Sequence, residues 1–161
     1  MKKFGIEIIW AFVFVAMSLA WMYLEKLTGL HSQHIGKHYI YSNLMAIPAI
    51  GIYVLALLHK RHTFYEGDMS WLQGFISGLI ITLFVTILSP LTQVITTKFI
   101  TPEYFPNIIE YMVNKGKMTL DVAESCFSLR SYIIQGFLGA PILGAITSAL
   151  VAIFIRTKSK N

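Results

Sequence analysis

Four long apolar stretches, separated by shorter polar segments, form the main pattern of this chain. A helix that crosses a bilayer needs about 20 mostly apolar residues, and each stretch is close to that length. The pattern therefore predicts an all-α polytopic integral membrane protein with a single membrane domain over residues 1–161. The four expected transmembrane helices lie at about residues 6–24, 39–58, 71–95 and 132–155.

The first stretch begins like a secretory signal peptide, because Lys2 and Lys3 precede an apolar run. Glu7 interrupts the start of that run, so we expect the stretch to remain as a transmembrane helix rather than to be removed. Glu7 and Glu25 bracket the span. Both are expected to lie at the membrane surface, where a carboxylate reaches water or pairs with a nearby lysine.

Residues 100–130, between the third and fourth spans, are less hydrophobic and carry signals for helix starts. Thr101 and Pro102 suit the cap and the first position of one helix. Thr119 precedes a second short helix, after a break at residues 114–117. The segment is therefore expected to form a helical hairpin or lid at the membrane surface.

Pro90 lies near the end of the third span and is followed by polar residues. A proline inside a helix removes a backbone hydrogen bond and favours a kink. Irregular or polar backbone at membrane depth is tolerated where protein or a wet cavity covers it. We therefore expect a covered region beside Pro90, and the candidate residues for a polar cavity are Glu25, Gln93 and Gln135.

The composition agrees with a membrane protein, because 55% of the residues are hydrophobic, 13% are charged and the mean hydropathy is +0.63. A net charge of +5 would suggest nucleic acid in a soluble protein, but here the basic residues lie at the ends of apolar runs. Membrane lipids, not nucleic acids, are therefore the expected partners. The density of positive charge in short segments favours cytoplasmic N and C termini. The residues that carry it are Lys2, Lys3, Lys60, Arg61, Arg156, Lys158 and Lys160.

The fourth span carries a small residue at every fourth position, and the third span has glycines at a matching spacing. Small residues let two helix backbones approach closely in lipid. Contact between the third and fourth spans is the favoured interpretation, and a homodimer seam is the alternative. The predicted helix-packing residues are Gly74, Gly78, Gly136, Ala140, Gly144 and Ser148.

An offset of 93 residues superposes Tyr39-Ile40 on Tyr132-Ile133 and also Pro48 on Pro141. Such an echo would arise if two hairpins of two spans each formed a parallel repeat. Pro90 has no counterpart in the first span, so similar composition of two apolar spans is the alternative explanation.

Three histidines, His31, His34 and His38, lie between the first two spans, close to Glu25. On a helix they would share one side, and three imidazoles can hold zinc or another transition metal. A pH-responsive or proton-handling site is the competing interpretation. No established metal motif is matched, so no cofactor is assigned. Haem with two histidine ligands is not expected, because no histidine lies in the middle of a span.

Sequence motifs of common enzymes are absent. The chain has no phosphate-binding glycine loop, no G-x-S-x-G and no H-E-x-x-H. Cys126 is the single cysteine, which excludes a disulfide within the chain. These absences favour a protein that is not an enzyme.

Several short stretches occur together, among them Trp21-Met22-Tyr23-Leu24-Glu25, Ala46-Ile47-Pro48-Ala49-Ile50, Ser89-Pro90-Leu91 and Ile100-Thr101-Pro102. In this combination the chain resembles an uncharacterised family of bacterial four-span inner-membrane proteins, a domain of unknown function. The resemblance covers nearly the whole chain and implies one larger loop between the third and fourth spans. The family supplies no activity, so no functional residue is carried over from it.

Three functions stay open from the sequence. The leading hypothesis is an accessory subunit or a small homo-oligomeric transport or channel unit, which acts through association with itself or with a membrane-protein partner. The second is a metal-binding membrane enzyme or sensor that uses the histidine cluster. The third is binding of a lipid or another amphiphile beneath the 100–130 loop, near Pro90.

Overall fold

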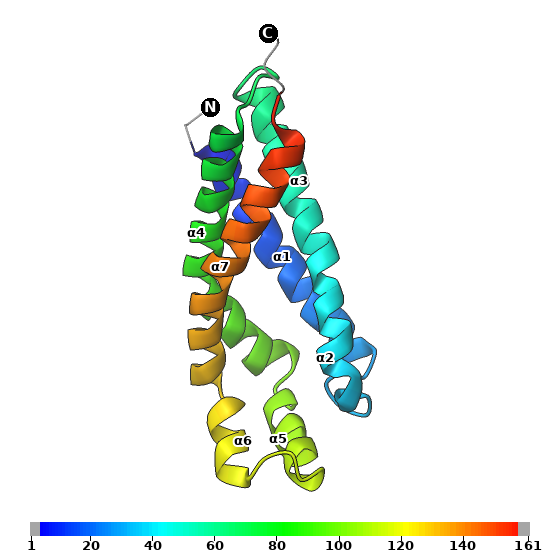
Figure 1. The fold of residues 1–161 in the computed structure, drawn as a ribbon. Coiled ribbons are helices and arrows are strands. Elements are labelled where there is room, and N and C mark those ends of the chain that lie inside the picture. Colours follow the sequence, from blue (N-terminus) through cyan, green and yellow to red (C-terminus); the bar gives the residue numbers. More distant parts are fainter. Residues whose placement is uncertain (1–3, 158–161) are drawn as a thin grey trace.

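A computed structural model describes residues 4–157 and contains helices but no strand in that range. Within the same range, four helical segments are long and apolar enough to cross a membrane: Gly5–Leu27, Ile35–Thr63, Trp71–Ile100 and Leu129–Ile155. The predicted four-span, all-α architecture is confirmed. Figure 1 shows an elongated bundle in which helix α1 begins and helix α7 ends at the same end.

Helices α1 (Gly5–Leu27) and α7 (Leu129–Ile155) form the first and fourth spans. Each is a few residues longer than the apolar pattern indicated. At the start of α7, the hydroxyl of Ser128 accepts a hydrogen bond from the backbone N–H of Ser131. This contact satisfies one of the backbone donors that every helix start leaves unpaired.

The second span is irregular where it begins. Two short 3-10 turns, η1 (Ile35–Lys37) and η2 (Ser42–Met45), flank a single turn of α-helix, α2 (His38–Tyr41), before α3 (Ala46–Thr63) starts. The expected span at 39–58 therefore covers three elements. Pro48 is in the first turn of α3. Backbone N–H groups in the first turn have no partner within the helix, so a proline there costs no hydrogen bond.

Helix α4 (Trp71–Ile95) starts at a capping box, in which Ser70 Oγ accepts from the Gln73 N–H and Gln73 Oε1 accepts from the Ser70 N–H. Pro90 lies inside this helix, and the chain continues beyond it into a π-helical turn, η3 (Thr96–Ile100). In Figure 1 the last part of this segment turns away from α7. The end of the third span therefore diverges from α7.

Two short helices, α5 (Tyr104–Asn114) and α6 (Leu120–Cys126), form the connection between the third and fourth spans. The predicted helical loop is thus confirmed. Both lie at the end of the bundle opposite to the termini (Figure 1). Tyr104 and Ile108 are buried together with Ile35, which precedes α2. The loop therefore packs onto the start of the second span.

Helices α4 and α7 contact each other along their small residues. A methyl group placed on Gly78 would lie 2.5 Å from Cβ of Ser148, and one placed on Gly144 would overlap the side chain of Thr82. Carbon atoms normally approach only to about 3.5–4.0 Å. Glycine is therefore required at both positions, and this part of each stripe is covered by the other helix and is not open to a second chain.

The rest of the stripe is packed less tightly. A methyl group on Gly74 would meet Cβ of Ala152 at 3.2 Å, whereas one on Gly136 would meet no atom closer than Ser89 Oγ at 3.8 Å. Ala140 lines a cavity between the helices. The contact between α4 and α7 therefore loosens towards the end that carries α5 and α6.

The buried apolar core contains residues from all four spans and lies in the half of the bundle near the termini. Its members are Ala11, Tyr53, Ala56, Leu57, Met69, Ile81, Val85, Val151 and Ile155. Many large apolar side chains elsewhere point outwards, with Phe154 86% and Leu138 63% exposed. In a membrane these outer faces contact acyl chains.

Polar contacts close the end of the bundle where the termini lie. Arg61 Nη1 donates to the backbone carbonyl of Ile155 at 2.8 Å, and the Thr157 N–H donates to the carbonyl of Met69 at 2.9 Å. The predicted orientation also depends on four terminal lysines that lie outside the described residues: Lys2, Lys3, Lys158 and Lys160.

Candidate metal centre

The turn that ends α1 brings His31 back over Glu25. The Leu30 N–H donates to the carbonyl of Glu25 and the Gly29 N–H donates to the carbonyl of Lys26, both at 3.0 Å. This pair of hydrogen bonds is a Schellman motif. Gly29 has a φ of +74°, which glycine adopts without strain. The helix end therefore fixes the distance between Glu25 and His31 through the backbone.

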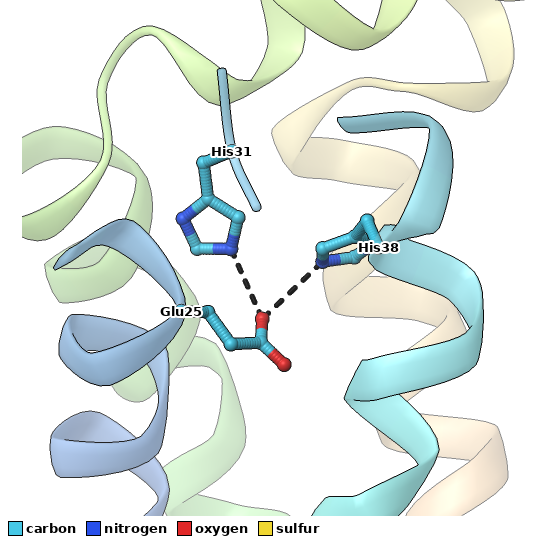
Figure 2. A group of neighbouring side chains, drawn as sticks. All are labelled: Glu25, His31 and His38. Carbon is cyan, nitrogen blue, oxygen red and sulfur yellow. Dashed lines mark hydrogen bonds and ion pairs between the residues drawn. The ribbon is translucent and has the colours of Figure 1, made fainter. Parts of the chain in front are cut away.

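Glu25, His31 and His38 meet in one cluster, which Figure 2 shows with both imidazoles directed at the same carboxylate oxygen. Glu25 Oε2 lies 3.0 Å from His31 Nε2 and 3.3 Å from His38 Nε2. One ligand atom from each residue lies within 4.8 Å of the other two. Helix α1, the turn after it and the first residue of α2 each contribute one member.

The cluster is enclosed by protein. Glu25 is 2% exposed, His31 is 3% exposed, and the side chain of His38 is 18% exposed. Trp21 Nε1 and Ser42 Oγ each donate to Glu25 Oε1 at 2.7 Å, which leaves Oε2 to the imidazoles. Within residues 4–157, no lysine or arginine forms an ion pair with Glu25.

Two tyrosines extend the polar network away from the cluster. The Tyr104 hydroxyl lies 3.5 Å from His38 Nδ1 and 3.1 Å from the Tyr132 hydroxyl. Burial, together with the neighbouring Tyr132, raises the pKa of the Tyr104 phenol, so its hydroxyl keeps its proton. Contacts on the second ring nitrogen orient imidazoles that bind a metal through the first.

The geometry of the cluster fits a small divalent transition-metal ion. Zinc binds nitrogen and oxygen at about 2.0–2.2 Å, which sets neighbouring ligand atoms of a tetrahedron about 3.3 Å apart. The two measured separations from Glu25 Oε2 are 3.0 and 3.3 Å. Nε2 of His38 is buried and faces Glu25 Oε2 at 3.3 Å, but no described atom meets it in good hydrogen-bond geometry. A metal ion between the three atoms would satisfy that nitrogen.

Two of the three histidines singled out in the sequence, His31 and His38, belong to this cluster. His34 is exposed and lies outside it. The residues between His31 and His38 form a turn and then η1 rather than one continuous helix, so positions 31, 34 and 38 do not share a face. Glu25 supplies the third ligand atom.

A cavity of about 650 Å³ lies between α1, α3, α4 and α7. Gln93 and Gln135 line it, whereas Glu25 does not. Ser42 and Tyr132 line the cavity as well. Because Ser42 also donates to Glu25, one end of the cavity lies beside the metal cluster.

A second buried carboxylate lies at the other end of α1. Glu7 is 1% exposed, its Oε1 lies 2.9 Å from Lys60 Nζ, and Ser77 Oγ donates to the same oxygen at 2.8 Å. The Lys60 ammonium also lies 4.0 Å from the centroid of the Phe64 ring. This group joins α1, α3 and α4 and carries its own positive charge.

Both carboxylates of α1 are buried within the bundle, so neither reaches water as expected, and the lysine that pairs with Glu7 is Lys60 of α3. Glu7 and Glu25 are 18 residues apart (25 minus 7), which is five turns at about 3.6 residues per turn. They therefore share one face of α1, and Ala11 and Ser18 are also buried. The spacing in the sequence therefore shows that the two carboxylates lie on the same side of α1, and the structure shows that this side faces the bundle.

The comparisons with known proteins give a family but no activity. No curated protein and no solved structure matches the chain. A family described as a protein of unknown function, DUF4199, matches residues 9–157, which include Glu25, His31 and His38. The chain is therefore a member of the DUF4199 family.

Proposed function

We propose that this multi-pass membrane protein binds a divalent transition-metal ion of the zinc class through Glu25, His31 and His38. The observation that carries the proposal is the convergence of three enclosed ligand atoms within 4.8 Å. Two imidazoles and one carboxylate are the donors that Zn²⁺ and neighbouring transition metals prefer. A buried carboxylate also requires a positive partner, and an ion in the cluster supplies it.

Three protein ligands leave one position of a tetrahedral ion open. Structural zinc sites are usually closed by four protein ligands, whereas catalytic sites keep a position for water or substrate. The donor set therefore favours an ion that binds water or a substrate at its open position over an ion with a purely structural role. A metal-dependent enzyme or sensor is the function that this chemistry supports.

The metal is tested on protein purified in detergent, incubated with Zn²⁺ and passed through a desalting column. We expect about one zinc per chain in the wild type. Zinc should be nearly absent from His31→Gln and His38→Gln, and His34→Gln is the matched control that keeps it. Far-ultraviolet circular dichroism checks that every variant is folded. Negligible zinc in the folded wild type, or equal zinc in all four proteins, would contradict the proposal.

We also propose that the protein lies in a bacterial inner membrane with both termini in the cytoplasm. The charge density of the short segments and the family resemblance support this orientation. In it, the metal cluster and α6 lie on the extracytoplasmic side. Cys126, on α6 and partly exposed, is a natural probe. A membrane-impermeant maleimide should label Cys126 in intact cells, and Cys126→Ser gives the background labelling. Labelling that appears only after permeabilisation would indicate the opposite orientation.

A further inference from the structure

The cavity between α1, α3, α4 and α7 has walls of two kinds. Most of its lining surface is apolar, with side chains such as Phe14 and Val15 on α1, Ile50 on α3 and Leu143 on α7. Its volume of about 650 Å³ lies inside the range of about 300–1,000 Å³ that is usual for small-molecule sites. Its walls come from all four spans, so the cavity lies within the membrane-spanning part of the bundle.

Most of the polar side chains in the lining lie towards one end of the cavity, beside η3 and the start of α7. They are Ser42, Asn43, Ser89, Thr92, Gln93, Thr96, Tyr132 and Gln135. Ser18, Thr82 and Thr147 also line the cavity, outside that group. The Thr96 hydroxyl is buried and has no hydrogen-bond partner among the described residues, whereas Gln93 beside it is only partly buried. Buried polar groups normally have partners, so the Thr96 hydroxyl lacks one that a ligand in the cavity supplies.

The charge of the lining restricts what that ligand is. No lysine, arginine, histidine, aspartate or glutamate in the described part of the chain lines the cavity. An ionised head group in such a site would lose its hydration without gaining a counter-charge, which is strongly unfavourable. An uncharged head that both donates and accepts hydrogen bonds fits the amide and hydroxyl groups.

We propose that this cavity binds a single-chain lipid with an uncharged, hydroxyl-bearing head, such as a monoacylglycerol. The acyl chain lies between α1, α3 and α7, and the head lies at the polar end, next to Gln93 and Thr96. Ser42 and Tyr132 place this head beside the metal cluster. The site itself is independent of the metal, because none of the three metal ligands lines it.

A glycine in the wall gives a clean way to fill the cavity. A methyl group on Gly139 would meet no atom within 4 Å, so a larger side chain there enters empty space rather than a neighbouring helix. Gly51 on α3 is equally unobstructed but does not line the cavity. Gly139→Leu and Gly51→Leu are therefore a matched pair, with the same change in a transmembrane helix and only one of them in the site.

The experiment uses the full chain in liposomes with a photoreactive diazirine analogue of monopalmitoylglycerol. Ultraviolet irradiation should crosslink the probe to wild-type protein, with the label on peptides that line the cavity. Labelling should fall about tenfold or more in Gly139→Leu, because the leucine takes the space of several buried methylene groups. It should be unchanged in Gly51→Leu. The diazirine analogue of palmitate, which carries a charged head, should label the wild type weakly.

Each result decides one part of the proposal. Equal labelling of Gly139→Leu and Gly51→Leu, or a label spread over the outer faces, would show that the cavity holds no lipid. Strong saturable labelling by the palmitate analogue would overturn the uncharged head. Gln93→Leu tests the head position, because it should weaken labelling by the glycerol probe without changing labelling by a diazirine alkane. His31→Gln should keep the label, which separates this site from the metal proposal.

Discussion

Replacement of Gly78 by alanine should loosen the contact between α4 and α7. The new Cβ would lie 2.5 Å from Cβ of Ser148 and 3.3 Å from its Cα, so rotation of the serine side chain does not relieve the overlap. To restore contacts of about 3.5–4.0 Å, the two helices must separate by about 1 Å, which forfeits a quarter to a half of the local dispersion energy. Overpacking of this kind costs about 1–3 kcal/mol.

The assay is unfolding in mixed micelles followed by circular dichroism, with Gly51→Ala as control. A methyl group on Gly51 meets no atom within 4 Å, so that variant should stay within about 1 kcal/mol of the wild type. The double variant Gly78→Ala, Ser148→Gly should recover much of the loss, because it removes the side chain that the new methyl group meets. Equal unfolding free energies for Gly78→Ala and Gly51→Ala would refute the packing described between the two helices.

The polar clusters give three further predictions. Lys60→Met leaves Glu7 buried without its cation and should lower the unfolding free energy by about 3–5 kcal/mol, whereas Glu7→Leu combined with Lys60→Met should recover most of it in the same micelle assay. Ser42→Ala removes one donor from the buried carboxylate of Glu25 and should cost about 1–3 kcal/mol, with weaker zinc binding by calorimetry. His34→Ala changes an exposed side chain outside the cluster and should shift the unfolding free energy by less than about 0.5 kcal/mol.

The number and order of the helices could be predicted from the sequence because lipid imposes a simple rule. Each span must satisfy its own backbone and present apolar side chains, and both requirements are visible as long apolar runs. The helical loop was also visible, although α5 begins at Tyr104 and not at the predicted cap of Thr101 and Pro102. Thr119 directly precedes α6, as expected. The irregular entry to α3, with 3-10 turns at Ile35–Lys37 and Ser42–Met45, was not visible. Ile35, in the first of these turns, packs against Tyr104 and Ile108 of α5, and a tertiary contact of this kind cannot be read from the local sequence.

The candidate site was only partly accessible to the same reasoning. His31 and His38 were found because they are close in sequence, and His34 was included because a regular helix was assumed. Glu25 was assigned to the surface by its place near the end of a span. Its true environment depends on the Schellman turn at Gly29, which brings His31 back towards it. The hydropathy of the sequence does not reveal that the chain turns back at Gly29.

The two carboxylates of α1 occupy similar places in the fold but differ in charge balance. At about 1.5 Å per residue, Glu7 and Glu25 are separated by about 27 Å along the helix, close to the thickness of a bilayer core of about 30 Å. Glu7 has Lys60 at 2.9 Å, so its charge is neutralised within the chain. Glu25 has only two imidazoles at similar distances, and among the described residues no permanent cation pairs with it. The first arrangement is complete as it stands and joins three spans. The second has no permanent cation, so its charge is balanced either by a proton on one of the two imidazoles or by a bound metal ion, and the zinc measurement separates the two.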